Sequence, residues 1–245
     1  MDSLGRMLSI FDLLTEDTAE ITPEQVAAHL DCSRTTSYRY LKALTEAGFL
    51  AGHSGGRYGL GVRIVQMDRQ MRLTDPLLQR AEDLLMPLSR QIGENLLLNG
   101  HYGKSLVCIA QAWINQQQLT NYGRGQSVPL FRGAAGKVIL AHLPAHQLKA
   151  IYKKYPQEIA AAGLGEFWPQ FRDRLRAIRQ RGYDVTHAEV DPGIAGVAAP
   201  IFDGDNGILG SLAIAIPVER LPEDLTVLVA PLKETVQKIT DRGRA

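Results

Sequence analysis

Hydrogen-bond donors are concentrated in a short segment near the N-terminus of the 245-residue chain. Residues 33–42 carry arginine, lysine, serine and threonine side chains, and the next acid, Glu46, follows only after them. Guanidinium, ammonium and hydroxyl groups at helical spacing are the groups that reach base edges and phosphates of DNA. The segment therefore predicts a DNA recognition helix, with a plain polar surface helix as the alternative.

A helix-turn-helix would position this segment. A first amphipathic helix is predicted from the apolar stripe Leu4, Leu8, Ile10, Phe11 and Leu14. A second, short helix is predicted at 22–30, where Thr22 is an N-cap with a proline and a capping-box glutamine behind it. The third helix takes Ser33 as its N-cap and ends at Gly48. Its predicted inner stripe is Tyr38, Leu41 and Leu44.

A β-hairpin is predicted directly after the third helix. Two short apolar segments flank a turn that contains Gly55 and Gly56, which is typical of a tight hairpin. Such a hairpin is the wing of a winged helix-turn-helix, and its polar residues contact the DNA backbone. The complete set of expected DNA contacts is Ser33, Arg34, Thr35, Thr36, Ser37, Tyr38, Arg39, Lys42, His53, Ser54 and Arg57.

Charge is distributed unevenly although the formal net charge is only +1. Residues 1–31 hold seven acids and one basic residue, whereas residues 33–72 hold seven basic residues and two acids. A near-neutral protein can carry a basic DNA-binding stripe in this way. The acidic segment is expected to face away from phosphate. A solvated charged face is the alternative interpretation.

The remainder of the chain predicts a linker helix and a larger α+β domain. Apolar and basic residues alternate at helical spacing from Val62 to Met71, so this helix packs either on a partner subunit or on its own chain. Beyond it we expect antiparallel strands at 95–101, 105–111, 116–122, 183–186, 196–202 and 208–216. Helices are expected at 77–92, 137–143, 147–154, 167–180 and 225–239, covering one face of a curved sheet. The predicted domains are 1–61, 62–75 and 76–245.

Small residues at 133–136 precede the helix predicted at 137–143. Free backbone N–H groups and the helix dipole favour a carboxylate at such an N-terminus, and the absence of bulky side chains lets it approach. The segment therefore predicts a place where a ligand can approach the backbone.

Catalytic and metal sites find little support in the sequence. His142 and His146 lie four apart, but Pro144 separates them and no HExxH motif is present. Cys108 lies in an apolar strand, which suits an inert thiol. Lys137 is followed by valine, so the phosphate-loop pattern fails. No cofactor or metal is expected.

Two acids, the two cysteines and the length of the apolar runs also bear on the function. Glu189 and Asp191 are interpreted as part of a loop that hydrogen-bonds ligand hydroxyls, with an acidic pair or simple solvation as alternatives. Cys32 and Cys108 form no disulfide framework, and no apolar run approaches the length of a membrane span. We expect a cytoplasmic protein without a membrane partner.

Taken together, these residues resemble the IclR family of bacterial transcriptional regulators. The resemblance extends from about Leu4 to Ile239, and four stretches carry it: 33–39, the wing with 58–61, 129–137 and 182–203. It implies a winged helix-turn-helix, a linker helix and a GAF/profilin-like effector domain. It also implies homodimers, or homotetramers as dimers of dimers, on palindromic operator DNA, controlling catabolic operons for small organic acids that are often aromatic.

The resemblance also implies an effector pocket. Its residues would be Gln117, Thr120, Leu130, Ala134, Ala135, Thr186, Ile194, Gly196, Ala213 and Ala215. Family members that bind very small polar acids tend to place Asp, Cys or Ser where this chain has threonine, glycine and alanine. A roomier and drier pocket follows, suited to a hydroxylated aromatic carboxylate, with Asn99, Trp113, Asn121 or Tyr122 at its wall. Alanines that merely pack the sheet are the alternative.

Two other classes of protein remain open. A small-molecule-modifying enzyme with an accessory domain would need a metal site or a reactive cysteine. A ligand-sensing adaptor would have lost the basic residues of the third helix, and these residues are present.

Overall fold

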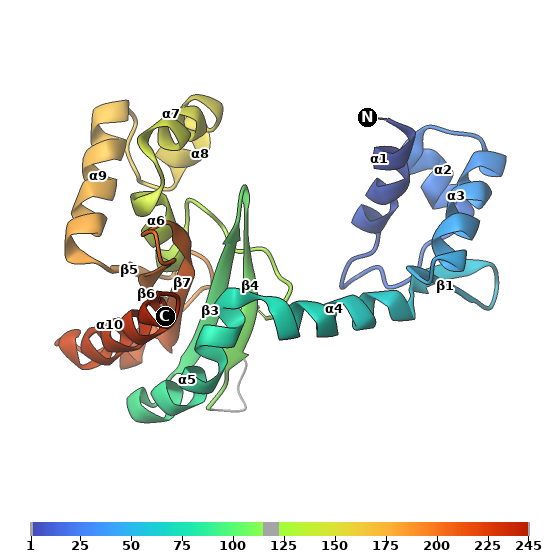
Figure 1. Cartoon of the computed structure of the whole chain (residues 1–245). Coiled ribbons are helices and arrows are strands. Elements are labelled where there is room, and N and C mark those ends of the chain that lie inside the picture. The colour runs from blue at the N-terminus through green and yellow to red at the C-terminus, as the bar shows by residue number, and fades with distance from the viewer. Residues whose placement is uncertain (1, 115–122, 245) are drawn as a thin grey trace. The chain divides into compact units, whose positions relative to one another are not determined.

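The computed structural model describes residues 2–114 and 123–244, which form two compact units (Figure 1). The first unit is Met1–Asp75 and the second is Pro76–Ala245. The strand expected at 116–122, with Gln117 and Thr120, therefore lies outside the described residues, as do Asn121 and Tyr122.

The N-terminal unit is a winged helix-turn-helix followed by a long helix. Its elements are α1 Ser3–Leu8, a 3-10 turn Ser9–Leu13, α2 Pro23–Leu30, α3 Arg34–Glu46, β1 Leu50–His53, β2 Arg57–Leu60 and α4 Val62–Thr74. The fully buried side chains of Ile10, Ile21, Val26 and Leu41 form the centre of its core. The two strands pair antiparallel, from Leu50 opposite Leu60 to His53 opposite Arg57.

Local signals set the ends of these elements. Thr22 and Gln25 form the expected capping box of α2, and the Ser33 hydroxyl accepts the Thr36 N–H at the start of α3. Gly48 takes φ +78° just after α3, a conformation that other residues rarely adopt. The helix boundaries predicted from these residues are confirmed.

Two predicted apolar stripes were wrong in detail. Leu4 and Leu8 are exposed, and the first helix changes to a 3-10 turn before Ile10 reaches the core. On α3, Tyr38 is 42% exposed while Ser37 is fully buried. The reason is helical geometry: Ser37, Leu41 and Leu44 follow the i, i+4, i+7 spacing that keeps one face aligned, whereas a stripe through Tyr38 drifts off it.

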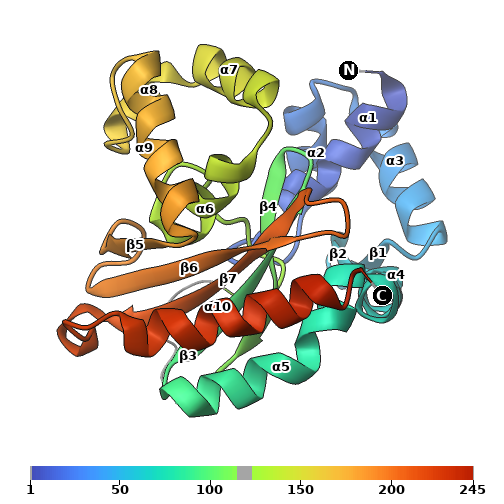
Figure 2. The same cartoon turned by 60° about the vertical axis from the view of Figure 1, so that its left-hand side comes forward.

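The C-terminal unit is built on a five-stranded antiparallel sheet with the order β4-β3-β7-β6-β5 (Figure 2). Its strands are β3 Asn95–Tyr102, β4 Ser105–Ala112, β5 Asp184–His187, β6 Ile194–Phe202 and β7 Ile208–Pro217. Its helices are α5 Pro76–Ile92, α6 Gly133–His142, α7 Ala145–Lys154, α8 Pro156–Ala161, α9 Trp168–Arg181 and α10 Thr226–Asp241, with a 3-10 turn at Val218–Arg220. The α+β class is confirmed.

Helices cover both faces of this sheet, so the expectation of one covered face was wrong. Leu96, Leu212 and Ile214 pack with α5 and α10, whereas Leu97 and Ala213 face α6 and α9 (Figure 2). Consecutive strand residues are buried on β3, β6 and β7, and this is the burial pattern of a strand with two covered faces.

Helices α6 and α8 also differ from expectation. Helix α6 begins at Gly133 rather than at Lys137, so the small residues form its first turn. The short α8 was not predicted, because six residues after a proline carry too little periodicity to be recognised.

Phe171 provides a test of the core that α9 forms with the neighbouring helices, where its ring contacts the rings of Tyr152 on α7 and Trp168. Its ring is fully buried, whereas Phe167, at the N-terminal end of the same helix, is 63% exposed. Phe171→Ala is expected to lower the free energy of unfolding of the C-terminal unit by about 3–5 kcal/mol, because it removes a large buried side chain and leaves a cavity. Phe167→Ala should change it by less than about 0.5 kcal/mol. Urea denaturation checks both, and equal losses would contradict this core.

Candidate functional site

The outer face of α3 presents most of the predicted DNA contacts to solvent. Ser33, Arg34, Thr35, Tyr38, Arg39 and Lys42 are exposed and Thr36 is half-buried. Ser37 differs, since it is 0% exposed and its hydroxyl donates to the Arg34 carbonyl at 2.8 Å. Its side chain supports the helix and has no free surface to offer to DNA.

Aromatic rings and acids hold the cations of this face in place. Arg34 contacts Glu24 at 2.7 Å and lies 5.6 Å from the centre of the Tyr38 ring. Arg39 lies 5.6 Å from the centre of the Tyr40 ring. These groups are exposed, so their pairing is weak and solvent-screened. A phosphate can therefore compete for them.

The wing is tied to an acid from the N-terminal segment. Glu20 contacts His53 Nδ1 at 3.0 Å and Arg57 Nη1 at 3.3 Å. Glu20 belongs to the acidic segment that is expected to face away from phosphate, yet it lies directly beside two of the predicted DNA-contact residues. No local sequence signal reveals the contact, because Glu20 and Arg57 are brought together by an antiparallel bridge between Ile21 and Tyr58.

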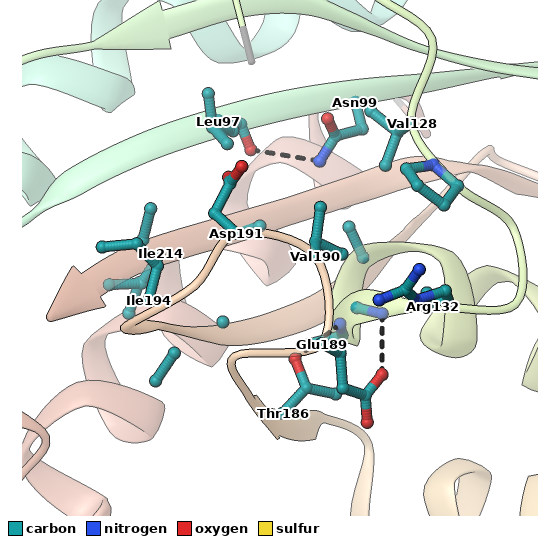
Figure 3. Close-up of a pocket in the computed structure, with 18 residues that line it drawn as sticks. Leu97, Asn99, Val128, Arg132, Thr186, Glu189, Val190, Asp191, Ile194 and Ile214 are labelled. Carbon is teal, nitrogen blue, oxygen red and sulfur yellow. Dashed lines mark hydrogen bonds between the residues drawn. The ribbon is translucent and has the colours of Figure 1, made fainter. Parts of the chain in front are cut away.

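A pocket lies in the C-terminal unit between α6, the sheet and the loop 188–193 (Figure 3). Its cavity is about 80 Å³, room for several water-sized groups at roughly 10–15 Å³ each. Seven of the residues expected at an effector site line it: Ala134, Ala135, Thr186, Ile194, Gly196, Ala213 and Ala215. Most of the remaining wall is apolar, including Leu97, Val128, Pro129, Val190 and Ile214.

Leu130, Asn99 and Trp113 were also expected at the wall of the pocket. Leu130 lines a neighbouring hollow with His101, Phe131 and Tyr155 rather than this pocket. Asn99 does line the pocket, whereas Trp113 is not among its lining residues.

The N-terminus of α6 forms the polar end of the pocket, and the protein's own side chains occupy much of it. The Gly133 N–H donates to Glu189 Oε2 at 2.9 Å, and the Ala134 N–H donates to Thr186 Oγ1 at 3.1 Å. Lys137 Nζ lies 2.5 Å from Glu189 Oε1. The sequence pattern indicates a loop at Glu189 that hydrogen-bonds ligand hydroxyls, and it does not predict the pairing of Glu189 with Lys137.

Lys137 is the buried charge of this site, with only 5% of its surface exposed. A buried ammonium needs an anionic partner, and removing that partner from a buried pair is strongly destabilising. Asp184 is a second buried acid nearby and pairs with Arg181 at 2.9 Å. Burial raises the pKa of Asp184, and the Lys137 ammonium partly offsets this effect.

The backbone at the start of α6 is packed too closely for larger residues. A Cβ atom at position 136 would collide with the carbonyl oxygens of Pro129 and Leu130. Gly133 takes φ +76° and faces Val190 across the pocket edge. The small residues therefore serve backbone packing as well as access to the helix N-terminus.

Asn99 supplies an unusual polar group in the apolar wall. The side chain is 1% exposed, and its Nδ2 donates to the Leu97 carbonyl at 3.5 Å and to Ser211 Oγ at 3.4 Å. Within the described residues its Oδ1 has no hydrogen-bond partner. A buried acceptor left unpaired is costly, so this oxygen is suited to a donor on a ligand.

The catalytic candidates have the properties of structural groups. Burial raises the pKa of the Cys108 thiol to about 11, which keeps it protonated and unreactive at neutral pH. His142 bonds the Val138 carbonyl, and burial lowers its pKa. Across residues 2–114 and 123–244, no cluster of three or more metal-binding side chains occurs, and no helix there has the length and apolar character to cross a membrane.

A winged helix-turn-helix joined to a separate domain with an apolar pocket defines a DNA-binding regulator that responds to a small molecule. Residues 3–53 match the IclR helix-turn-helix domain, and residues 73–241 match the bacterial transcriptional regulator IclR C-terminal domain. The chain belongs to the IclR family of transcriptional regulators.

Curated relatives and solved structures agree with this assignment. The chain is 25% identical over 244 residues to the transcriptional regulator KdgR of Escherichia coli, covering 98% of this chain and 92% of KdgR. It is 27% identical over 225 residues to the glycerol operon regulatory protein of Streptomyces coelicolor, covering 90% and 87%. The IclR structure of Thermotoga maritima matches with a TM-score of 0.73, 25% identity and 99% of both chains.

A further structure shares the fold at lower sequence identity. It is an IclR homolog of Microbacterium hydrocarbonoxydans complexed with 4-hydroxybenzoate, with a TM-score of 0.79, 16% identity and 99% of both chains covered.

Glu20 provides a test of the wing. Glu20→Gln removes the acid that His53 and Arg57 contact, so the His53 ring and the Arg57 guanidinium become available to phosphate. We expect DNA affinity at low salt to rise by about threefold, and the slope of log K against log salt to steepen by up to about 1 per added phosphate contact. Asp17→Asn, in the same segment and exposed, removes the same charge without touching the wing and serves as control. Fluorescence anisotropy titrations measure both variants. Equal effects would show that Glu20 acts only through the net charge of the protein and not through its contacts with the wing.

Proposed function

We propose that this regulator is a one-component sensor of a small organic acid, a hydroxylated aromatic carboxylate, at a catabolic operon. Acid binding in the C-terminal pocket changes the affinity of the winged helix-turn-helix for operator DNA. For this to happen the acid must bind one conformation of the protein more tightly than the other.

The observation that carries the ligand class is the polarity of the pocket. One end holds the amides at the start of α6, and the buried Lys137 ammonium contacts the lining residue Glu189 there; both groups favour a carboxylate. The walls are largely aliphatic, which suits an aromatic ring. Asn99 Oδ1 is an acceptor that matches a ring hydroxyl. The IclR homolog complexed with 4-hydroxybenzoate supports the same class of ligand.

The residues assigned to effector binding follow from that pocket. Ala134, Ala135 and Thr186 stand at the carboxylate end, with Ile194, Gly196, Ala213 and Ala215 along the wall. Gln117, Thr120 and Leu130 remain assigned only by the family resemblance.

Operator recognition is assigned to α3 and the wing. In this proposal α3 enters the major groove and presents Arg34, Thr35, Arg39 and Lys42, while Ser54 and Arg57 approach the backbone. Exposure of these α3 side chains supports the assignment.

We further propose that the protein acts as a homodimer, or as a dimer of dimers, on a palindromic operator. Helix α4 has no buried residue, and it exposes Val62, Val65, Met67, Met71 and Leu73. Exposed apolar side chains at this density mark an interaction surface, and two half-sites need two subunits. The domain limits 1–61, 62–75 and 76–245 belong to the same proposal.

The acid response is tested by an operator titration. The promoter region beside the protein's own gene is the probe, and the acids are hydroxybenzoates, benzoate, pyruvate and glyoxylate. We expect specific, salt-dependent binding that a hydroxybenzoate changes by about 5–150-fold, the usual range of allosteric coupling. Tight binding of pyruvate or glyoxylate with no response to any benzoate would overturn the proposed ligand class.

Arg39 tests the recognition helix. Arg39→Ala is expected to weaken operator binding by about 1–3 kcal/mol and to relax the base preference at one position, because its guanidinium reads a base edge. Arg174→Ala, an exposed arginine of α9 in the other unit, is the control and should leave binding unchanged. Gel shifts on single-base operator variants measure both effects. An unchanged shift for Arg39→Ala would show that α3 is not the reading helix.

A further inference from the structure

The carboxylate of Glu189 stands where the pocket is best suited to bind an acid. It accepts the Gly133 N–H at the first turn of α6 and pairs with the buried Lys137 ammonium at 2.5 Å. Gly133 and Glu189 line the polar end of the pocket to which the proposed effector would bring its own carboxylate, and Lys137 contacts Glu189 without itself being a lining residue (Figure 3). The chain therefore already supplies an anion at this position.

A second carboxylate cannot simply be added beside the first. Lys137 is 5% exposed and carries one positive charge, which Glu189 neutralises. Two carboxylates that share one cation in an apolar pocket repel each other, and an uncompensated buried charge is costly. Arg132 also lines the pocket, but it is exposed, so solvent screens its charge. An acid that approaches the Gly133 N–H and the Lys137 ammonium therefore competes with Glu189 for them, whereas an uncharged molecule does not compete for the ammonium.

The position of Glu189 on the chain connects this exchange to the loop between β5 and β6. Glu189 lies in the loop 188–193, whose residues Val190 and Asp191 also line the pocket. The loop starts at Ala188 with φ +49°, a strained conformation for a residue with a side chain, and ends at Gly193 with φ +74°. The backbone bond from the Ala188 N–H to the Ile194 carbonyl closes the base of the loop, and the Gly193 carbonyl accepts the Val218 N–H. The Glu189 contacts hold the first part of the loop on α6.

We propose that Glu189 is an internal substitute for the effector's carboxylate, and that a free carboxylate binds by replacing it on Gly133 and Lys137. The exchange releases the loop 188–193 from α6, so the loop reports whether the bound molecule carries a negative charge. This inference rests on the proposed function for the identity of the pocket and adds how the pocket distinguishes an acid from a neutral analogue.

Chemical rescue with acetate tests the exchange without knowledge of the natural effector. Glu189→Ala leaves Lys137 unpaired, so its melting temperature in sodium chloride is expected to fall by several degrees. Replacing chloride by acetate at equal ionic strength should restore a large part of this loss and continue to stabilise with the logarithm of acetate concentration. Acetamide should not restore it. Asp191→Ala, in the same loop and lining the same pocket, is the matched control and should not respond specifically to acetate.

Equal acetate responses of wild type, Glu189→Ala and Asp191→Ala would overturn the proposal, because the place of Glu189 would then be closed to a free carboxylate. Hydrogen exchange on the wild-type chain provides a test that needs no variant. Saturating 4-hydroxybenzoate should speed amide exchange in residues 188–194 severalfold, and 4-hydroxybenzamide should not. Unchanged exchange with bound 4-hydroxybenzoate would show that Glu189 stays on Lys137.

The two tests separate this inference from the proposed function. If acetate rescues Glu189→Ala but 4-hydroxybenzoate neither binds nor changes operator affinity, the replacement of Glu189 by a free carboxylate is supported and the proposed ligand class fails. The opposite outcome is that 4-hydroxybenzoate binds and changes operator affinity, while acetate does not rescue Glu189→Ala and the amide hydrogen-exchange rate of the loop does not change. The proposed function is then supported, and Glu189 is only a structural cap of α6.

Discussion

The buried ammonium of Lys137 constrains the whole polar end of the effector pocket. Because only 5% of its surface is exposed, it requires an anion within contact distance, and Glu189 provides one at 2.5 Å. Together with the bond from the Gly133 N–H to Glu189, this pair holds the loop 188–193 against the first turn of α6. The close backbone packing around Gly136 holds the same turn against the segment before it.

The same arrangement recurs in the DNA-binding unit. There Glu24 contacts Arg34, and Glu20 contacts His53 and Arg57, so acids of the chain occupy side chains that are predicted to contact DNA. The difference between the units is burial. The cations on α3 and the wing are exposed and screened by solvent, which makes exchange for DNA easy, whereas Lys137 is buried, which makes exchange selective for a charged ligand.

Local chemistry was predictable from the sequence, and long-range contacts were not. The caps at Thr22, Ser33 and Gly48 act within a few residues, so they set helix boundaries correctly. The sequence predicted that Tyr38 faces the core, but Ser37 does so instead. Which of the two is buried depends on the rotation of α3 about its axis, and the packing of the core sets that rotation. Pairing of Glu189 with Lys137 and of Glu20 with Arg57 joins residues far apart in sequence, and no periodicity encodes it. The pocket walls were identified through the family resemblance rather than through local pattern.

The most direct test of this account is a crystal structure of the full-length protein with the acid that changes its operator affinity. The account predicts that the ligand's carboxylate accepts the Gly133 N–H and pairs with Lys137, that Glu189 has moved away, and that the loop 188–193 has left α6. A ligand bound elsewhere in the pocket, with Glu189 still on Lys137 and the loop unchanged, would contradict it.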